Sequence, residues 1–570
     1  MKKTGLIIGL LGIYMSIYAD TQRMWIFLSD KGENVQKRLS KPSAFLSKAS
    51  LALKKEKGIV LNAQDLPVWQ SYIGALAGYD CKVLSTSKWL NAVAVDIPDN
   101  CIEEVRDLCF VTGLTVVQKF KVAREGVEKE VEGAKYVKMN SQYVQGDAFD
   151  YGDAKEQAEM LNVPALHKRG ITGRGVRIAV FDAGFEGVDT IDVFDSLWIQ
   201  KRVIAWYDFV DYDKTLFRND NHGTNVLSCI AANQPGKMVG IAPHVSVILG
   251  RTEDSDSETN REEHNWVRAM EWADSIGVDI IHSSLGYTNF DDKVSSYKYA
   301  DMNGNTAISS RAADAAAARG IVVTLSAGNE GDDPWRHIAA PSDADSVLCV
   351  GAVGRNGKRA SFSSMGPSSD GQVKPDVMAI GKGTTVAAPG NYITTSNGTS
   401  FSGPIMGGFM ALLKQAHPKR KNMELIQATR LSGDQYNFPD SLYGYGIPNI
   451  WIADSLLKNV KNLATVKMPG TELPKRGEKP KMAVVEKKVE MTKNPKTGVG
   501  VEGNKLVVKS TSFIIKAEIR KDDMRVILPK AAYKVNEKDA TFDIHSLVKG
   551  EHYLYIKTDS YEEYIKFEKK

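Results

Sequence analysis

The chain has 570 residues, which exceeds the length of one ordinary domain and predicts two to four domains. Apolar residues make up 43% and charged residues 25% of the composition, as in soluble globular proteins. The formal net charge of +4 is small for this length. Composition therefore gives no support to binding of nucleic acid or of an anionic membrane surface, and we expect no nucleic acid partner.

The first residues have the pattern of a signal peptide. Lys2 and Lys3 precede an apolar run at 5–18, and Ala19 offers a small residue at the cleavage point. The run is shorter than the roughly 20 residues of a membrane span, and no cysteine follows it that could carry a lipid anchor. We expect a cleaved signal peptide at 1–19 and a protein that is secreted or held at the cell surface.

Residues 20–140 predict a small α+β domain followed by a connection. Helix-like stretches alternate with strand-like ones, at 66–77, 83–87, 92–97, 101–108 and 116–119. The segment at 123–133 is charged and has no apolar periodicity, so we expect an exposed connection that is open to cleavage.

Residues 141–462 predict an α/β domain. Short apolar runs alternate with longer amphipathic stretches, which is typical of a mostly parallel sheet with helices on both faces. The expected strands are at 176–181, 245–249, 278–281, 321–326 and 347–353, and the expected helices include 262–276 and 306–319.

The composition changes again after residue 462. Residues 463–504 are rich in lysine and poor in aromatic residues, which is typical of a flexible linker. Their positive charge could also attract an anionic partner, but a solvated spacer explains it sufficiently. Residues 505–570 carry β-rich runs at 506–508, 513–515, 524–528, 553–556 and 564–567, and predict a small all-β domain.

The five cysteines are too few and too scattered for a disulfide framework, and none has the spacing of metal ligands. We expect buried free thiols. They are Cys81, Cys101, Cys109, Cys229 and Cys349.

Three polar side chains in the α/β region can act together in nucleophilic catalysis. Asp182 follows the apolar strand at its C-terminal end, His222 lies in the segment NHGT at 221–224, and Ser400 lies in GTSFSGP at 398–404. A serine hydroxyl attacks well only when a base takes its proton, and an imidazole with a pKa of about 6.5 can do so at pH 7. A carboxylate can hold that imidazole in the required tautomer.

Asn329, in the segment SAGNEG at 326–331, offers an amide N–H to an oxyanion. Ser400 is expected at a helix N-terminus, with Pro404 in the first turn, where its missing N–H is not needed. Taken singly, each of these residues has a structural explanation, because serine caps helices, asparagine forms turns and most histidines are structural.

The chain order Asp182, His222, Ser400 resembles that of the subtilisin family of serine peptidases, and the resemblance covers 157–453. It implies a serine endopeptidase that forms an acyl-enzyme on Ser400 with an Asp182–His222 relay. Asn329 and the Ser400 N–H would form the oxyanion hole. It also implies a zymogen, in which the domain at 20–140 assists folding and blocks the cleft. An unrelated accessory domain is the alternative for 20–140.

The same resemblance implies how polypeptide substrates bind. Ser284, Leu285 and Gly286 would pair with the substrate backbone, and Ala327 and Gly328 would wall the primary pocket together with Ala339. No acid or base falls among these residues, so we expect an apolar or broad preference.

No metal site or cofactor is expected. The segment between His222 and the GIAP at 240–243 is short, so the calcium loop of many relatives is missing. Asp208, Asp211 and Asp213 could bind calcium, but three acids on one loop are usually solvated.

Within the family the chain resembles secreted enzymes of Bacteroidetes, through the segments RTED at 251–254, EWAD at 271–274 and GYG at 444–446. The stretch at 542–570 resembles the sorting domains of their type IX secretion system. A surface binding protein on a catalytically silent peptidase scaffold is the alternative. A lipase or esterase is disfavoured, because α/β-hydrolases carry the three residues in the order serine, acid, histidine.

Overall fold

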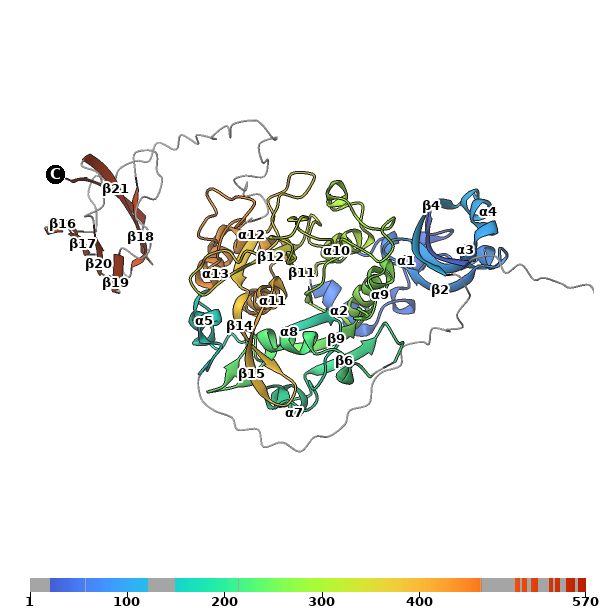
Figure 1. Cartoon of the computed structure of the whole chain (residues 1–570), viewed down its shortest axis with the longest axis horizontal. Coiled ribbons are helices and arrows are strands. Elements are labelled where there is room, and N and C mark those ends of the chain that lie inside the picture. The colour runs from blue at the N-terminus through green and yellow to red at the C-terminus, as the bar shows by residue number, and fades with distance from the viewer. Residues whose placement is uncertain are drawn as a thin grey trace, which may run out of the picture. The chain divides into compact units, whose positions relative to one another are not determined.

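The computed structural model describes residues 21–56, 58–120, 149–213, 215–461 and 463, and strand segments between 498 and 569. The expected signal peptide, the connection at 123–133 and nearly all of the expected linker lie outside the described residues. The chain divides into two compact units, Met1–Lys475 and Arg476–Lys570 (Figure 1).

The first unit begins with a four-stranded antiparallel sheet in the order β2-β3-β1-β4. Helices α3 and α4 pack against this sheet. Two further helices, α1 and α2, lie in the long segment between β1 and α3. The bounds are β1 Thr21–Leu28, α1 Val35–Leu39, α2 Lys48–Glu56, α3 Gln70–Ala77, β2 Lys82–Ser87, β3 Ala92–Pro98, α4 Ile102–Arg106 and β4 Val111–Phe120.

Both faces of this N-terminal sheet are buried. Because successive side chains of a strand point to opposite faces, Met24 and Ile26 of β1 pack into the sheet's own core with α3 and α4. Trp25, between them, packs into a second core that also contains Trp266 and Met270 of the following domain. The sheet therefore lies between its own helices and the large domain.

The large domain is built on a seven-stranded parallel sheet in the order β13-β12-β11-β10-β5-β9-β6. The strands are β5 Arg177–Asp182, β6 Val203–Asp208, β9 Ser246–Arg251, β10 Ile280–Ser283, β11 Val322–Ser326, β12 Leu348–Val353 and β13 Val377–Ile380. The five expected strands are present, and β6 and β13 extend the sheet at its two edges.

Helices cover both faces of this sheet, which confirms the expected fold class (Figure 1). Ile178 and Val180 of β5 pack against α8 His222–Ala231 and α11 Thr399–Ala416. Ala179 and Phe181, which point the other way, pack against α9 Asn260–Ile276 and α10 Ile308–Ala318. The alternation along one strand thus divides the core into two layers.

Smaller elements complete the large domain. They are α5 Lys155–Glu159, α6 Pro164–His167, α7 Asp195–Ile199, β7 Asn233–Gln234, β8 Met238–Val239, the hairpin β14 Lys382–Ala388 and β15 Tyr392–Asn397, α12 Asn422–Leu431 and α13 Ile450–Asn459. Among the described residues, no helix is long and apolar enough to cross a membrane.

The second unit contains only β-strands among its described residues, in two antiparallel sheets ordered β16-β17-β20-β19 and β18-β21-β22. β16 begins at Gly498, inside the range expected as linker, because valines alternate there with glycine and glutamate. The expected strand at 524–528 lies outside the described residues. The bounds are β16 Gly498–Glu502, β17 Lys505–Lys509, β18 Ile514–Arg520, β19 Tyr533–Asn536, β20 Asp539–Asp543, β21 Gly550–Thr558 and β22 Glu562–Lys569.

The five thiols are free, but not all are buried. Cys109 is exposed and Cys101 is partly exposed, so the expectation of burial was wrong for these two. Cys109 lies in the turn between α4 and β4, where the chain runs over the surface. Cys229 and Cys349 are fully buried, and burial raises the pKa of each thiol to about 12.

Candidate active site

The predicted site residues meet at the carboxyl ends of the central strands. Asp182 is the last residue of β5, and His222 is the first residue of α8. Ser400 is the second residue of α11, and Asn329 follows β11 by three residues. Parallel sheets present their sites at this edge, because the connecting loops and helix N-termini converge there.

Asp182 and His222 are directly hydrogen-bonded. The distance from Asp182 Oδ1 to His222 Nδ1 is 2.6 Å, and the same oxygen accepts the Ala183 N–H at 2.9 Å. The carboxylate is fully buried. Gly223 permits this approach, since a Cβ there would lie 2.4 Å from the Gly184 carbonyl oxygen and 2.8 Å from the Asp182 Cβ. The pair therefore depends on a glycine directly after the histidine.

The Asp182 carboxylate sets the charge state of His222. Burial by itself lowers the pKa of the imidazole, but the charge and hydrogen bond of Asp182 outweigh this. The carboxylate of Asp220 acts in the same direction, so the net result is a pKa above the ordinary value. About a third of the His222 side chain, 34%, remains exposed, so the imidazole can be reached from the solvent.

Ser400 is nearly buried, with 7% exposure. Its Oγ donates to the Ser284 carbonyl oxygen at 3.4 Å, and the described contacts include no hydrogen bond between this Oγ and His222. The ring of the neighbouring Phe401 lies 5.9 Å from the His222 ring, centroid to centroid. His222 thus lies beside the first turn of α11, and a bond from the Ser400 hydroxyl to the imidazole would require this hydroxyl to leave Ser284.

The sequence had predicted Pro404 in the first turn of its helix, but the structure places it further along α11. The helix begins at Thr399, which places Pro404 inside it, where its N–H would have bonded to the Ser400 carbonyl. The Ser284 hydroxyl donates to that carbonyl instead, at 2.8 Å. The ring of His282, fully buried on β10, contacts the same hydroxyl through Nε2 at 2.8 Å.

His282 was not among the residues expected at the site. Its signal was a lone histidine within an apolar strand, Ile280 to Ser283. Burial lowers its pKa to about 3, so the ring is neutral. The carbon Cε1 of the ring would lie only 2.8 Å from a Cβ at Gly403, which brings α11 close to the strand.

Asn329 is oriented by Thr399. The Asn329 side-chain oxygen accepts the Thr399 N–H at 2.8 Å and faces the Thr399 hydroxyl at 3.0 Å. An N–H can only donate, so the oxygen of the carboxamide must be the atom on this side and its NH₂ group must point away from Thr399. Gly328, with φ of 105°, makes the turn that carries Asn329.

Residues 173–446 match the model of the subtilase family, and residues 23–133 match the peptidase S8 propeptide domain of Bacteroidota. Subtilisin from Bacillus pumilus is 32% identical over 302 residues, which cover 51% of this chain and 96% of the relative. The chain belongs to the subtilase family. It is a subtilisin-like serine peptidase that is made with a propeptide.

Other subtilisins give the same result. Subtilisin NAT from Bacillus subtilis subsp. natto is 28% identical over 381 residues, covering 65% of this chain and 83% of the relative. Subtilisin DY from Bacillus licheniformis is 31% identical over 295 residues, covering 51% and 95%. The matches extend over most of each relative's length.

Three of the residues expected at the primary pocket, Gly286, Ala327 and Ala339, lie close together. A Cβ at Gly286 would lie 3.0 Å from the Ala339 Cβ, and the Ala339 N–H donates to the Ala327 carbonyl at 3.3 Å. Leu285 and Ser284 continue β10 into this region.

The residues expected at the pocket wall include no acid or base, but a carboxylate lies beside one of them. A Cβ at Gly328 would lie 2.4 Å from Glu330 Oε2, so this carboxylate borders the glycine of the wall. It accepts the Ser364 hydroxyl at 2.8 Å. The sequence could not place Glu330, because the position of its side chain depends on Ser364, which is distant in the chain.

The acids considered for calcium are largely paired with an arginine of the subtilase domain. Arg251 donates to Asp208 Oδ2 at 2.9 Å and to Asp211 Oδ2 at 2.6 Å. Asp208 is fully buried and therefore not solvated, contrary to the expectation. The charge of the buried Asp208 carboxylate is balanced by the Arg251 guanidinium.

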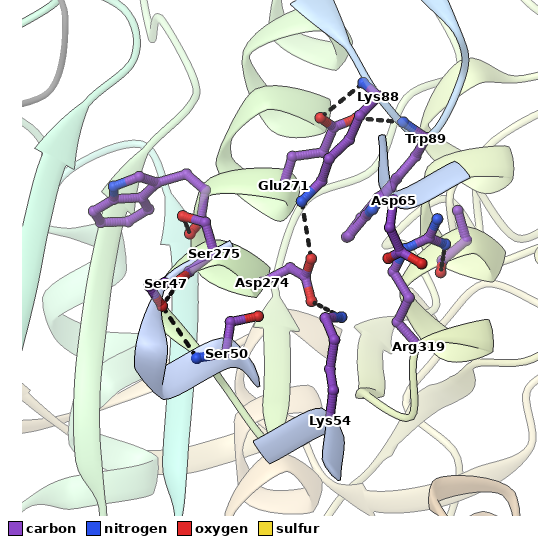
Figure 2. Close-up of polar contacts among 12 residues, drawn as sticks. Ser47, Ser50, Lys54, Asp65, Lys88, Trp89, Glu271, Asp274, Ser275 and Arg319 are labelled. Atoms are coloured by element: carbon purple, nitrogen blue, oxygen red, sulfur yellow. Dashed lines mark hydrogen bonds and ion pairs between the residues drawn. The ribbon is translucent and has the colours of Figure 1, made fainter. Parts of the chain in front are cut away.

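The propeptide domain packs on α9 and α10. Its Trp25 and Trp89 lie in the core that contains Trp266 and Met270. Glu271 of α9 accepts the Trp89 N–H at 3.0 Å, and its other oxygen accepts the Lys88 N–H at 3.0 Å (Figure 2). An apolar face and a carboxylate on helix α9 thus hold the turn between β2 and β3.

Proposed function

We propose that Asp182, His222 and Ser400 form the catalytic triad of a secreted endopeptidase. The observation that carries this proposal is the 2.6 Å hydrogen bond from buried Asp182 to His222, at the strand edge where α11 presents Ser400. In this role the aspartate fixes the tautomer in which Nδ1 carries the proton, so that Nε2 is the free base.

The reaction follows from these positions. The Ser400 oxygen attacks the peptide carbonyl carbon while His222 Nε2 takes the hydroxyl proton. The carbonyl oxygen becomes an oxyanion that accepts hydrogen bonds from the Asn329 NH₂ group and the Ser400 N–H. His222 then gives its proton to the leaving amine, and the acyl-enzyme remains. Water then attacks the ester carbon while His222 takes its proton, and His222 returns that proton to the Ser400 oxygen as the C–O bond breaks and the acid leaves.

The substrates are polypeptides in extended conformation. Residues 284–286 follow β10 directly, and their backbone can pair with a substrate strand, which favours peptides over small esters. The pocket beside Gly286, Ala327 and Gly328 would take the side chain on the acyl side of the cleaved bond.

The chain is organised, in this proposal, as an exported zymogen. A signal peptide at 1–19 directs export, residues 20–140 hold the propeptide and its connection, and 141–462 form the peptidase domain. Residues 463–504 form a linker and 505–570 a sorting domain for the type IX machinery. The basis is the pattern of the sequence and the propeptide match at 23–133.

A fluorophosphonate probe tests the proposed triad. The secreted protein and its Ser400→Ala variant are exposed to the probe, and the N-termini of the products are sequenced. We expect labelling that is absent from the variant, and a new N-terminus between 121 and 148 in the wild type alone. No labelling after the propeptide is removed would favour the binding protein on a silent scaffold.

A further inference from the structure

The propeptide domain carries a long insertion that does not belong to its sheet. Residues 29–69, between β1 and α3, contain α1 and α2, and we refer to this segment as the arm. Buried Lys31 ties the arm to its own domain, because its Nζ donates to the Leu66 carbonyl at 2.9 Å and to the Lys88 carbonyl at 2.6 Å. The arm therefore moves with the propeptide sheet.

The arm reaches the ends of α9 and α10 (Figure 2). The Ser47 hydroxyl donates to the Ser275 carbonyl at 2.5 Å, near the C-terminal end of α9. Asp65 pairs with Arg319, just beyond α10, at 3.3 Å. These contacts are separate from the apolar face through which the propeptide sheet packs on the same helices.

Asp274 of α9 is the centre of the arm's contact. Its two carboxylate oxygens accept from Lys54 Nζ at 2.7 Å and from Lys88 Nζ at 3.0 Å (Figure 2). The side chains of Asp274 and Lys54 are only 4% and 5% exposed. Burial raises the pKa of Asp274, but the two lysines outweigh it and lower the pKa, so the carboxylate stays charged.

Burial makes these pairs costly to separate one partner at a time. A carboxylate that loses one of its ammonium partners inside the interface keeps its desolvation cost and loses attraction. Arg319 is also buried and lies 4.8 Å from the Trp89 ring centroid, so it contacts both the arm and the β2–β3 turn. The charges therefore favour a state in which arm and sheet are docked together.

We propose that the arm is a second clamp that keeps the cleaved propeptide bound to the peptidase domain, with the Lys54–Asp274 pair as its main contact. This inference deepens the proposed zymogen and rests on it. Two linked contacts dissociate far more slowly than either one, because each holds the other at high local concentration. Loss of the arm contact leaves the sheet docked only by its own contacts, the apolar face and the bonds to Glu271, and release becomes faster.

The test measures release directly, on the full chain from residue 20 in a Ser400→Ala background. The chain is immobilised through an N-terminal tag, and a cleavage site for an added protease is placed between 121 and 148. After cleavage, the appearance of the peptidase domain in the wash gives the half-time of dissociation. The variant is Lys54→Ala, and the matched control is Lys55→Ala, an exposed lysine on the same helix.

We expect Lys54→Ala to shorten the half-time about tenfold, and Lys55→Ala to leave it unchanged. Asp274→Asn should act like Lys54→Ala, and the double variant should release no faster than Asp274→Asn alone.

Equal half-times for Lys54→Ala and Lys55→Ala would overturn the proposal. Thermal unfolding of each uncleaved variant separates a folding defect from faster release. Since no variant in this experiment is active, a failed triad would leave the binding result intact, and the probe experiment would report the triad alone.

Discussion

The hydroxyl of Ser284 donates to the carbonyl oxygen of Ser400 at 2.8 Å, in place of the N–H that Pro404 cannot supply. This bond fixes the backbone of the proposed nucleophile from the residue that follows β10. Ser284→Ala would leave the carbonyl unsatisfied, which costs ~1–3 kcal/mol for a buried group. We expect lower stability and a lower kcat with little change in KM, measured by thermal unfolding and steady-state kinetics.

Ser402→Ala is the matched control for Ser284→Ala. Ser402 is buried like Ser284 and lies on α11 close to Ser400, but its hydroxyl donates to the Thr399 carbonyl. A similar loss of stability without the loss in kcat is expected for this variant. Equal effects on kcat would mean that Ser284 acts through stability alone.

His222 should give the acidic limb of activity a midpoint above its ordinary pKa of about 6.5. Only the neutral imidazole can accept the Ser400 proton, so activity falls as the pH drops through the pKa. That pKa is raised, because Asp182 outweighs the effect of burial. The measurement is kcat/KM against pH, and a midpoint at or below 6.5 would contradict the charge state inferred from the pair.

Asn329→Ala tests the oxyanion donor. The Asn329 NH₂ group points away from Thr399, and its loss should lower kcat far more than it changes KM, since the bond forms only in the transition state. A loss of about 10²–10³ is known for this donor in subtilisin itself. Steady-state kinetics on a peptide substrate measure it, and a change confined to KM would remove Asn329 from the oxyanion hole.

The central strands could be predicted from the sequence because each is a continuous apolar run. The polar motifs follow directly at the C-terminal ends of these runs. Asp182 follows such a run, and its position at the sheet edge required no knowledge of distant residues. Edge strand β6 was not predicted, although residues 203–207 form an apolar run; at the edge of the sheet its Trp206 and Ala205 are only partly buried. The arm was missed for a similar reason: α2 is a short, lysine-rich helix whose Lys54 becomes buried only against Asp274.

Long-range contacts set the details that sequence could not give. Because α11 begins at Thr399, Pro404 lies inside the helix. The proline is tolerated because Ser284, a residue distant in the chain, donates a hydrogen bond to the Ser400 carbonyl. Glu330 was read as part of a turn motif, whereas Ser364 holds its carboxylate beside Gly328.

Glu330→Gln tests the charge at the primary pocket. A carboxylate at the wall should favour substrates with lysine or arginine on the acyl side of the cleaved bond over otherwise equal apolar ones. We expect the variant to lose about fivefold in this ratio of kcat/KM, in line with ~1 kcal/mol for a partly exposed ion pair. Asp332→Asn, which removes an exposed acid bonded to Ser361, is the control. An unchanged ratio in Glu330→Gln would place the carboxylate outside the pocket.

His264 should make the docked propeptide sensitive to acid. It is fully buried on α9 beneath the propeptide sheet, with Nε2 3.2 Å from the Ser85 hydroxyl and its ring 4.9 Å from the Trp25 ring. Burial lowers its pKa well below the ordinary value, and Arg268 and Arg261 of α9 and Arg23 of β1 act in the same direction. The bound state therefore holds a neutral imidazole, and no carboxylate is among the groups that shift it.

Release exposes this imidazole and removes Arg23, so its pKa rises toward the ordinary value of about 6.5. A histidine whose pKa is lower in the complex stabilises the complex fully above that value, and the stabilisation is lost as the pH falls below it. We expect the half-time of propeptide release to shorten between about pH 7.5 and pH 5.5 in the parent chain. His264→Gln cannot take up the proton, so its half-time should change much less over this interval. Since Asp274 has a lowered pKa, it stays charged throughout and does not supply the effect. An equal acceleration in His264→Gln would assign the acid response to another group.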